Sequence, residues 1–169
     1  MGAMSRKRVP FDLSRFESTT DCFICEFLAG NPRFPHHIVA ETETAVAFLN
    51  RFPTLEGYVL VVPKEHREQV TGDFSEDEYL DLQRLIFAVS EALRDIFAPE
   101  RVYILSLGSQ AANSHVHWHI APLPPGIPLE EQQYFALMHE NGVIETNSEE
   151  MAALAEKLRV KIDGIRRLS

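Results

Sequence analysis

Residues 115–122 read HVHWHIAP, and histidine alternates with apolar residues in this segment. In a β-strand successive side chains point to opposite faces, so positions i, i+2 and i+4 share one face. The alternation therefore predicts a strand whose Val116, Trp118 and Ile120 face the core. The other face of that strand carries three imidazoles, spaced by about 6 to 7 Å, from His115, His117 and His119.

Three interpretations of this histidine row are open. It is a chance row on a solvated sheet face, a three-histidine metal site, or a site where one imidazole attacks phosphorus while its neighbours bind oxygens and handle protons. The loop before the row favours the third, because small and amide side chains let an anion approach closely. The small and amide residues of this loop are Gly108, Ser109, Gln110, Asn113 and Ser114.

The size and charge of the chain narrow its class. A chain of 169 residues suits one domain with a sizeable core. A net charge of −9 argues against a protein that coats a nucleic-acid polymer, but it permits a small phosphorylated ligand in one local site. No apolar run reaches the roughly 18 to 20 residues that span a bilayer, and the basic start lacks the apolar segment of a secretory signal. We therefore expect a cytoplasmic protein without a membrane partner.

The first half of the chain predicts mostly strands. Residues 22–30 (CFICEFLAG) indicate a short helix or turn that ends at Gly30. Residues 37–42 and 44–50 alternate as the two arms of a β-hairpin. Residues 58–63 (YVLVVP) are rich in β-branched side chains and predict a further strand.

The second half brings one long helix and then shorter ones. Residues 75–97 have apolar side chains at helical spacing, with Ser75 and Glu78 placed as a capping box. A strand over 101–108 and the histidine strand follow. Two acidic helical stretches, at about 129–140 and 148–163, end the chain. This order predicts an α+β protein with a mostly antiparallel sheet.

The segment HVHWHIA matches the signature of the histidine triad (HIT) superfamily of nucleotide hydrolases and transferases. Residues 22–66, from CFICEF to PKEH, also resemble the amino-terminal half of that family, and the resemblance covers about residues 20–123. It implies a HIT-like fold with a five-stranded sheet, one long helix and additional C-terminal helices. The corresponding division is a flexible arm (1–18), a HIT domain (19–125) and a helical extension packed on that domain (126–169).

The resemblance implies a role for two of the histidines. His117, the middle one, attacks the α-phosphorus of a nucleotide and forms a covalent nucleotidyl-histidine. His119 hydrogen-bonds the phosphate and assists the leaving group. We therefore expect a nucleotide hydrolase or nucleotidyl transferase acting on a dinucleoside polyphosphate or a nucleoside phosphoramidate. The alternative is a nucleotide-binding or scaffold module with negligible turnover.

The substrate-binding residues are expected on two segments. Residues 47–53 (AFLNRFP) align with the family's nucleoside-holding segment, in which Asn50 replaces the Asp of many relatives and can still donate to and accept from a diol. The alternative for Asn50 is a turn-forming residue before a loop. The base is expected against Phe27 and Leu49, with Phe23 and Phe48 nearby, although each of these is also typical of an ordinary core. Phosphate contacts are expected from Gln110 and Asn113, in a loop (GSQAANSH) that departs from the family pattern.

A lone CxxC motif, Cys22 and Cys25, has no βαβ setting for redox chemistry. Some HIT relatives bind a structural zinc through such a pair, the histidine of a PKxH segment and the first triad histidine. That set is present here as Cys22, Cys25, His66 and His115, and four N/S ligands leave no open position on zinc. The alternative is two small buried thiols beside a surface His66.

Family members are commonly homodimers, and we expect one here. The expected partner is a small-molecule nucleotide rather than a nucleic-acid polymer. The remaining histidines, His36, His37 and His139, are predicted to be surface or loop residues without a catalytic role.

Overall fold

The computed structural model describes residues 7–11, 21–108 and 114–168. The strands are β1 (Arg8–Val9), β2 (Ile38–Glu41), β3 (Ala45–Leu49), β4 (Val59–Pro63), β5 (Arg101–Ser106), β6 (Trp118–Leu123) and β7 (Val143–Ile144). The α-helices are α1 (Phe23–Leu28), α2 (Glu76–Phe97), α3 (Tyr134–Leu137) and α4 (Ser148–Arg166). Two short 3-10 helices are η2 (Leu129–Glu131) and η3 (His139–Asn141).

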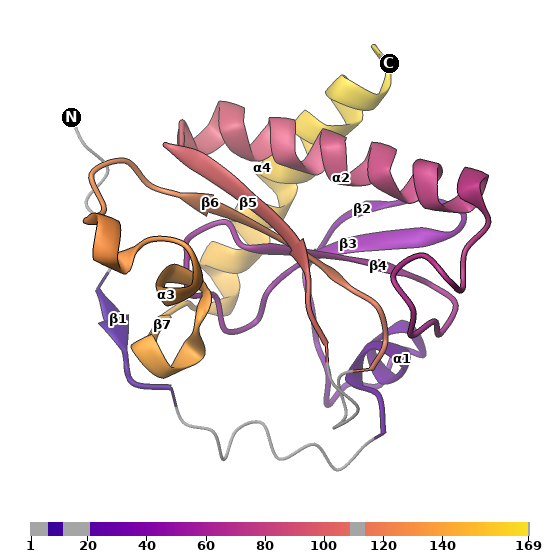
Figure 1. Cartoon of the computed structure of the whole chain (residues 1–169), viewed down its shortest axis with the longest axis horizontal. Helices are drawn as coiled ribbons and strands as arrows, with labels where there is room; N and C mark the ends of the chain where they lie inside the picture. The colour runs from indigo at the N-terminus through magenta and orange to yellow at the C-terminus, as the bar shows by residue number, and fades with distance from the viewer. Residues whose placement is uncertain (1–6, 12–20, 109–113, 169) are drawn as a thin grey trace.

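The main sheet has five strands in the order β2-β3-β4-β6-β5, and every neighbouring pair is antiparallel. β3 and β4 lie within it and are buried along their whole length. The long helices α2 and α4 cover one face, whereas the short α1 lies at the other side (Figure 1). The prediction of an α+β fold with a five-stranded antiparallel sheet and one long helix is confirmed.

Helix α2 forms as its sequence predicts. The Ser75 side chain accepts a hydrogen bond from the Glu78 backbone, and the Glu78 side chain accepts one from the Ser75 backbone. The chain leaves the helix at Ala98, which has a left-handed backbone with φ of 44°. The inner face of α2 packs on the sheet through a row of buried apolar residues, which includes Leu82, Leu85, Ile86, Val89 and Leu93.

The continuous helical stretch predicted over 129–140 is wrong. The segment contains η2, the four-residue α3 and η3 instead. Gln133 breaks the helix, since its φ of 55° and ψ of −127° are not helical, and its N–H donates to the Tyr103 hydroxyl at 2.9 Å. The second predicted helix is present as α4, and the Asn147 side chain caps it by accepting from the Glu150 N–H.

Part of the amino-terminal segment that was expected to be an irregular arm is ordered on the extension. Arg8 and Val9 form β1, which pairs with β7, and Arg8 donates from its guanidinium to the Ala136 carbonyl. Gly142 permits this pairing, because a Cβ there would lie 2.8 Å from the Val9 carbonyl oxygen. Residues 1–6 and 12–20 of the expected arm and its junction lie outside the described residues. No helix among the described residues is long and apolar enough to cross a membrane.

Candidate active site and metal cluster

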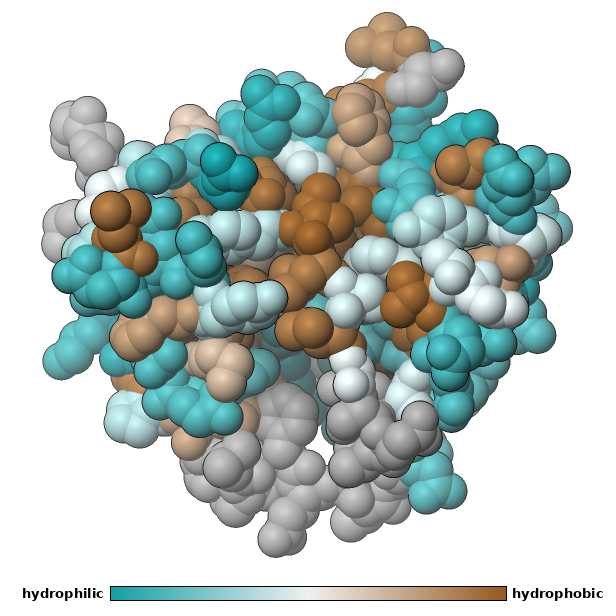
Figure 2. All heavy atoms as spheres, viewed as in Figure 1, coloured by the Kyte–Doolittle hydropathy of each residue, from teal (hydrophilic) through white to brown (hydrophobic). Residues whose placement is uncertain are grey.

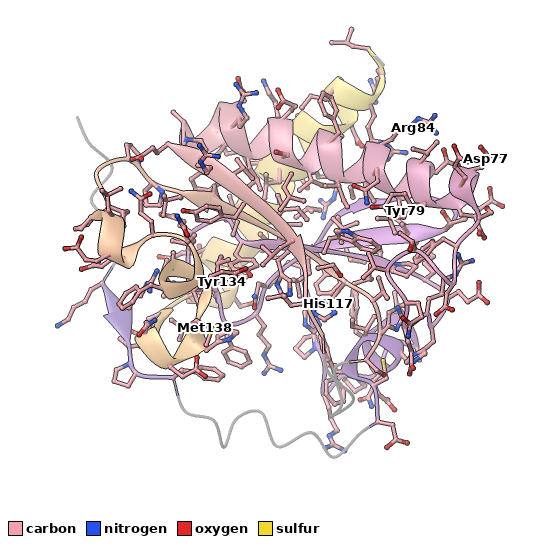
Figure 3. The ribbon with its side chains drawn as sticks, in the orientation of Figure 1. Asp77, Tyr79, Arg84, His117, Tyr134 and Met138 are labelled. Atoms are coloured by element: carbon pink, nitrogen blue, oxygen red, sulfur yellow. The ribbon has the colours of Figure 1, made fainter. Side chains whose placement is uncertain are left out.

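The alternation of the histidine segment holds, but the strand is shorter than predicted. β6 begins only at Trp118, so His115 and His117 precede it. The Val116 N–H donates to the Arg67 carbonyl at 2.6 Å rather than to a strand of the sheet. Val116 and Trp118 still belong to the core beneath α2, and His117 lies on the side of the sheet away from that helix (Figure 3).

His117 has the environment of a neutral nucleophile. Its side chain is buried, and its Nδ1–H donates to the His115 carbonyl at 2.7 Å. Since this bond places the ring proton on Nδ1, Nε2 carries the lone pair. Burial lowers the pKa of His117, which keeps the ring uncharged near neutral pH. The Ser106 hydroxyl donates to the His117 carbonyl at 2.8 Å and holds the backbone.

His119 contacts a residue that no sequence motif marks. Its Nδ1 lies 2.9 Å from the hydroxyl of Tyr58, and the two rings meet edge to face. Burial, together with neighbouring His117 and His139, lowers the pKa of His119 to about 3. Leu60 pairs with His119, so Tyr58, two positions earlier, lies on the same face. The contact between Tyr58 and His119 could not be predicted from the sequence, because it depends on the register of the two strands and nothing in the segment YVLVVP marks its tyrosine.

The four residues of the predicted metal set come together, and they could hold a metal ion. All their ligand atoms lie within 4.8 Å of one another. The Sγ of Cys25 is 3.3 Å from His66 Nδ1 and 3.6 Å from His115 Nδ1, and the Sγ of Cys22 is 3.5 Å from His115 Nδ1. Bond lengths of about 2.3 Å to sulfur and 2.0 Å to nitrogen separate ligand atoms on tetrahedral zinc by roughly 3.3 to 3.8 Å. The three sulfur–nitrogen distances fall in this range, so these residues could hold a metal ion.

The atoms around this cluster support metal binding. The Nε2–H of His115 donates to the Pro63 carbonyl at 2.9 Å, which leaves Nδ1 as the free ligand atom. His66 is placed in the same way by Glu68, 3.3 Å from its Nε2. Without an ion, burial and the neighbouring Cys22 raise the pKa of the Cys25 thiol to about 11. A cation at the cluster would therefore have to hold the thiolate form.

The predicted substrate-binding residues divide between the two faces of the sheet. The ring of Phe27 packs 4.8 Å from Phe48 in the cluster beside α1. Leu49 lies in the core beneath α2 and is 2% exposed. The side-chain oxygen of Asn50 accepts from the Phe52 N–H at 2.9 Å, as a turn residue does. Gln110 and Asn113 lie outside the described residues.

Of the three histidines expected at surface or loop positions, His36 lies in a loop and His139 in the short η3, and both are partly buried in aromatic clusters. His36 packs between Phe27 and Phe48, with a ring-centroid distance of 4.8 Å to each. His139 donates from Nε2 to the Phe52 carbonyl at 3.2 Å and packs 4.9 Å from Phe11. Such contacts join segments far apart in the chain, so no local pattern reveals them.

Comparison with known proteins places this geometry in a family. The model of the HIT domain matches residues 31–125. The chain is 30% identical to an adenosine 5'-monophosphoramidase of Schizosaccharomyces pombe over 132 residues, which are 70% of this chain and 94% of the relative. It is 29% identical over 140 residues to a bifunctional adenosine 5'-phosphosulfate phosphorylase/adenylylsulfatase of Arabidopsis thaliana, covering 82% of this chain and 91% of the relative.

A solved structure shows the same fold. The zinc-bound histidine triad family protein of Mycobacterium smegmatis superposes with a TM-score of 0.66 at 18% identity, covering 88% of this chain and 97% of that one. The family match covers the nucleophile candidate His117, its neighbour His119 and the carboxyl-terminal half of the metal cluster. The chain belongs to the HIT domain family.

Proposed function

We propose that this chain is a nucleotide hydrolase or nucleotidyl transferase that acts at the α-phosphate of a nucleotide derivative. The observation that carries the proposal is the hydrogen bond from His117 Nδ1–H to the His115 carbonyl, which points the Nε2 lone pair away from the backbone. A buried, neutral imidazole oriented in this way is a competent nucleophile. The names of the Schizosaccharomyces pombe and Arabidopsis thaliana relatives describe reactions of adenosine 5'-phosphoryl compounds, which supports the class of substrate.

The proposed reaction has two steps at phosphorus. His117 Nε2 attacks the α-phosphorus, so a P–N bond forms while the bond to the leaving group breaks. Water or another acceptor then attacks the same phosphorus, and the P–N electron pair returns to the imidazole. His119 hydrogen-bonds the phosphoryl group in both steps. Phosphoramidates and dinucleoside polyphosphates both carry an α-phosphorus that this sequence of steps accommodates.

The nucleoside is proposed to bind beside α1. Phe27, Phe48 and His36 form an aromatic cluster on this side of the sheet, in which the partly exposed Phe27 is suited to stack against a base and the fully buried Phe48 supports it. Asn50 still has its amide N–H groups for the ribose hydroxyls, because the turn uses only its oxygen. Leu49 supports this loop from the core, and Gln110 and Asn113 remain our candidates for phosphate contacts.

The metal cluster is proposed to bind one structural zinc. Two thiols and two imidazoles match the ligand preference of zinc. Four protein ligands would fill the tetrahedral coordination of the ion, so no open position would remain for a substrate or a catalytic water. When bound, the ion would hold α1 against the segment that precedes β6. His115 contributes its ring to the cluster and its carbonyl to His117, so the cluster positions the nucleophile.

We further propose a cytoplasmic homodimer that uses the outer edge of β5. β5 is the last strand of the main sheet, and its Ile104 is 47% exposed. Leu107, just beyond the strand, and Phe87, on α2, are exposed as well. Figure 2 shows apolar side chains gathered in the middle of this face. An unpaired strand edge with apolar side chains is a typical site of association.

Turnover by the purified chain tests the enzymatic function. AMP release from adenosine phosphoramidate and from diadenosine polyphosphates is measured for the wild type, His117→Ala and the control His37→Gln. We expect turnover by the wild type and the control, with a loss of about a thousandfold or more in His117→Ala. No turnover by the wild type on any of these substrates would favour the alternative, a nucleotide-binding module.

A further inference from the structure

Tyr58 brings a buried phenol to the triad. Its side chain is 4% exposed, and its hydroxyl lies 2.9 Å from His119 Nδ1. Among the described residues this nitrogen is the only recorded partner of the hydroxyl. The pairing raises the question of which of the two groups donates.

The burial of Tyr58 answers that question. If His119 carried its proton on Nδ1, the phenol proton would be buried without an acceptor, which is costly. The phenol is therefore satisfied only when it donates to Nδ1, which leaves the ring proton of neutral His119 on Nε2. The backbone of Leu107, which raises the pKa of His119, is consistent with an acceptor for that N–H.

We propose that Tyr58 is a positioning residue that holds His119 in the Nε2–H form, so that His119 serves the substrate as a neutral hydrogen-bond donor and not as the acid that protonates the leaving group. This inference rests on the proposed function for its catalytic part. Its structural part, the tautomer of His119, stands without it.

The proton balance excludes the acid role. To give up the Nε2 proton, neutral His119 would have to take the phenol proton at Nδ1 and leave a buried phenolate on Tyr58. Burial raises the pKa of Tyr58, which opposes that ion. A positive His119 is also opposed, mainly by the burial of its side chain and then by the neighbouring His117, which precedes β6, and His139 on η3. A polyphosphate leaving group therefore departs as its anion, whereas the amine of a phosphoramidate takes a proton from solvent water as its bond to phosphorus breaks.

Nitrogen-15 NMR of the ligand-free full chain tests the tautomer without any need for turnover. The imidazole signals of His119, assigned by their loss in His119→Gln, should show a protonated Nε2 and a bare Nδ1 in the wild type. In Tyr58→Phe we expect Nδ1–H to become populated. The control Tyr103→Phe removes a tyrosine hydroxyl that accepts from Gln133 elsewhere, and it should leave the signals of His119 unchanged. Nδ1–H in the wild type, or no change in Tyr58→Phe, would overturn the proposal.

A leaving-group series tests the catalytic part. For AMP derivatives with leaving groups of increasing pKa, a donor role predicts that His119→Gln slows kcat by the same factor throughout. Tyr58→Phe should slow all of them by about tenfold, the effect of one lost hydrogen bond, whereas Tyr103→Phe should not. A loss in His119→Gln that grows with the leaving-group pKa would show that His119 is an acid. If no substrate turns over, the proposed function fails while the NMR result still stands.

Discussion

The sulfur of Cys22 lies 3.5 Å from Nδ1 of His115, although the two residues are 93 positions apart in the chain. The same His115 accepts the Nδ1–H of His117 at its carbonyl oxygen. One residue thus joins the thiols at the start of α1 to the candidate nucleophile. A change in the cluster should therefore affect both stability and catalysis.

Loss of a thiol from the cluster should release the metal. We expect about one zinc per chain in protein purified without chelator, and none in Cys22→Ser. Because a closed site stabilises the folded chain, this variant should also lose several kcal/mol of unfolding free energy. Elemental analysis and chemical denaturation measure the two effects, with His37→Gln as the control. A wild type that is purified without metal and is no more stable than Cys22→Ser would contradict the zinc site.

Trp118 should contribute more than any other side chain of the histidine segment to anchoring that segment in the core beneath α2. It is 4% exposed, and its ring packs edge to face on Phe74 and Tyr79. Trp118→Ala is expected to cost about 3 to 5 kcal/mol in urea denaturation, from lost burial and the cavity left behind. Val160→Ala, at a position on α4 that is 65% exposed, should cost under about 0.5 kcal/mol. Similar costs in both variants would contradict the assignment of the core.

The stability of the chain should fall in mild acid. The pKa of His119 is about 3 in the folded protein and 6.5 in its ordinary state, so the unfolded chain binds a proton in this window that the folded chain does not. The unfolding free energy therefore decreases as the pH drops below 6.5, and this contribution is fully present above that value. His36, His117 and His139, whose pKa values burial also lowers, act in the same direction.

Denaturation of wild type and His119→Gln across this window measures the effect. The variant should lose stability less steeply with falling pH, because one of the protons taken up on unfolding is gone. Equal slopes in the two proteins would show that His119 titrates normally in the folded chain.

The β5 edge should control association. Ile104→Asp places a charge among exposed apolar side chains and is expected to convert a dimer into a monomer in light scattering. Val160→Asp, at a 65% exposed position on α4, is the matched control and should leave the mass unchanged. A wild-type monomer at all concentrations would remove the homodimer proposal.

The histidine alternation predicted which side chains enter the core, since Val116, Trp118 and Ile120 are buried. It did not predict where β6 begins, because Val116 pairs with the Arg67 carbonyl, a partner that only the tertiary fold supplies. The capping box of α2 is a local signal and was predicted in full. The break at Gln133 was not, since its backbone depends on the Tyr103 hydroxyl.

In the candidate site too, features marked by sequence motifs were predicted, whereas those that depend on tertiary contacts were not. The four cluster residues were found because their spacing resembles a known family, and the structure brings them within 4.8 Å. Tyr58 and His139 reach His119 from other segments, so neither could be found from a local pattern. Asn50 forms the turn that is the alternative interpretation of its position, because its side-chain oxygen accepts from the Phe52 N–H, and its contact with a ribose stays a prediction.

The covalent intermediate on His117 is the central claim, and mass spectrometry tests it most directly. The wild type is mixed with an adenosine 5'-phosphoryl substrate, stopped in denaturant at neutral to alkaline pH and digested. We predict one peptide that carries an added AMP on His117, present in the control His37→Gln and absent from His117→Ala. Turnover by the wild type without any such adduct, or an adduct on another residue, would contradict the account.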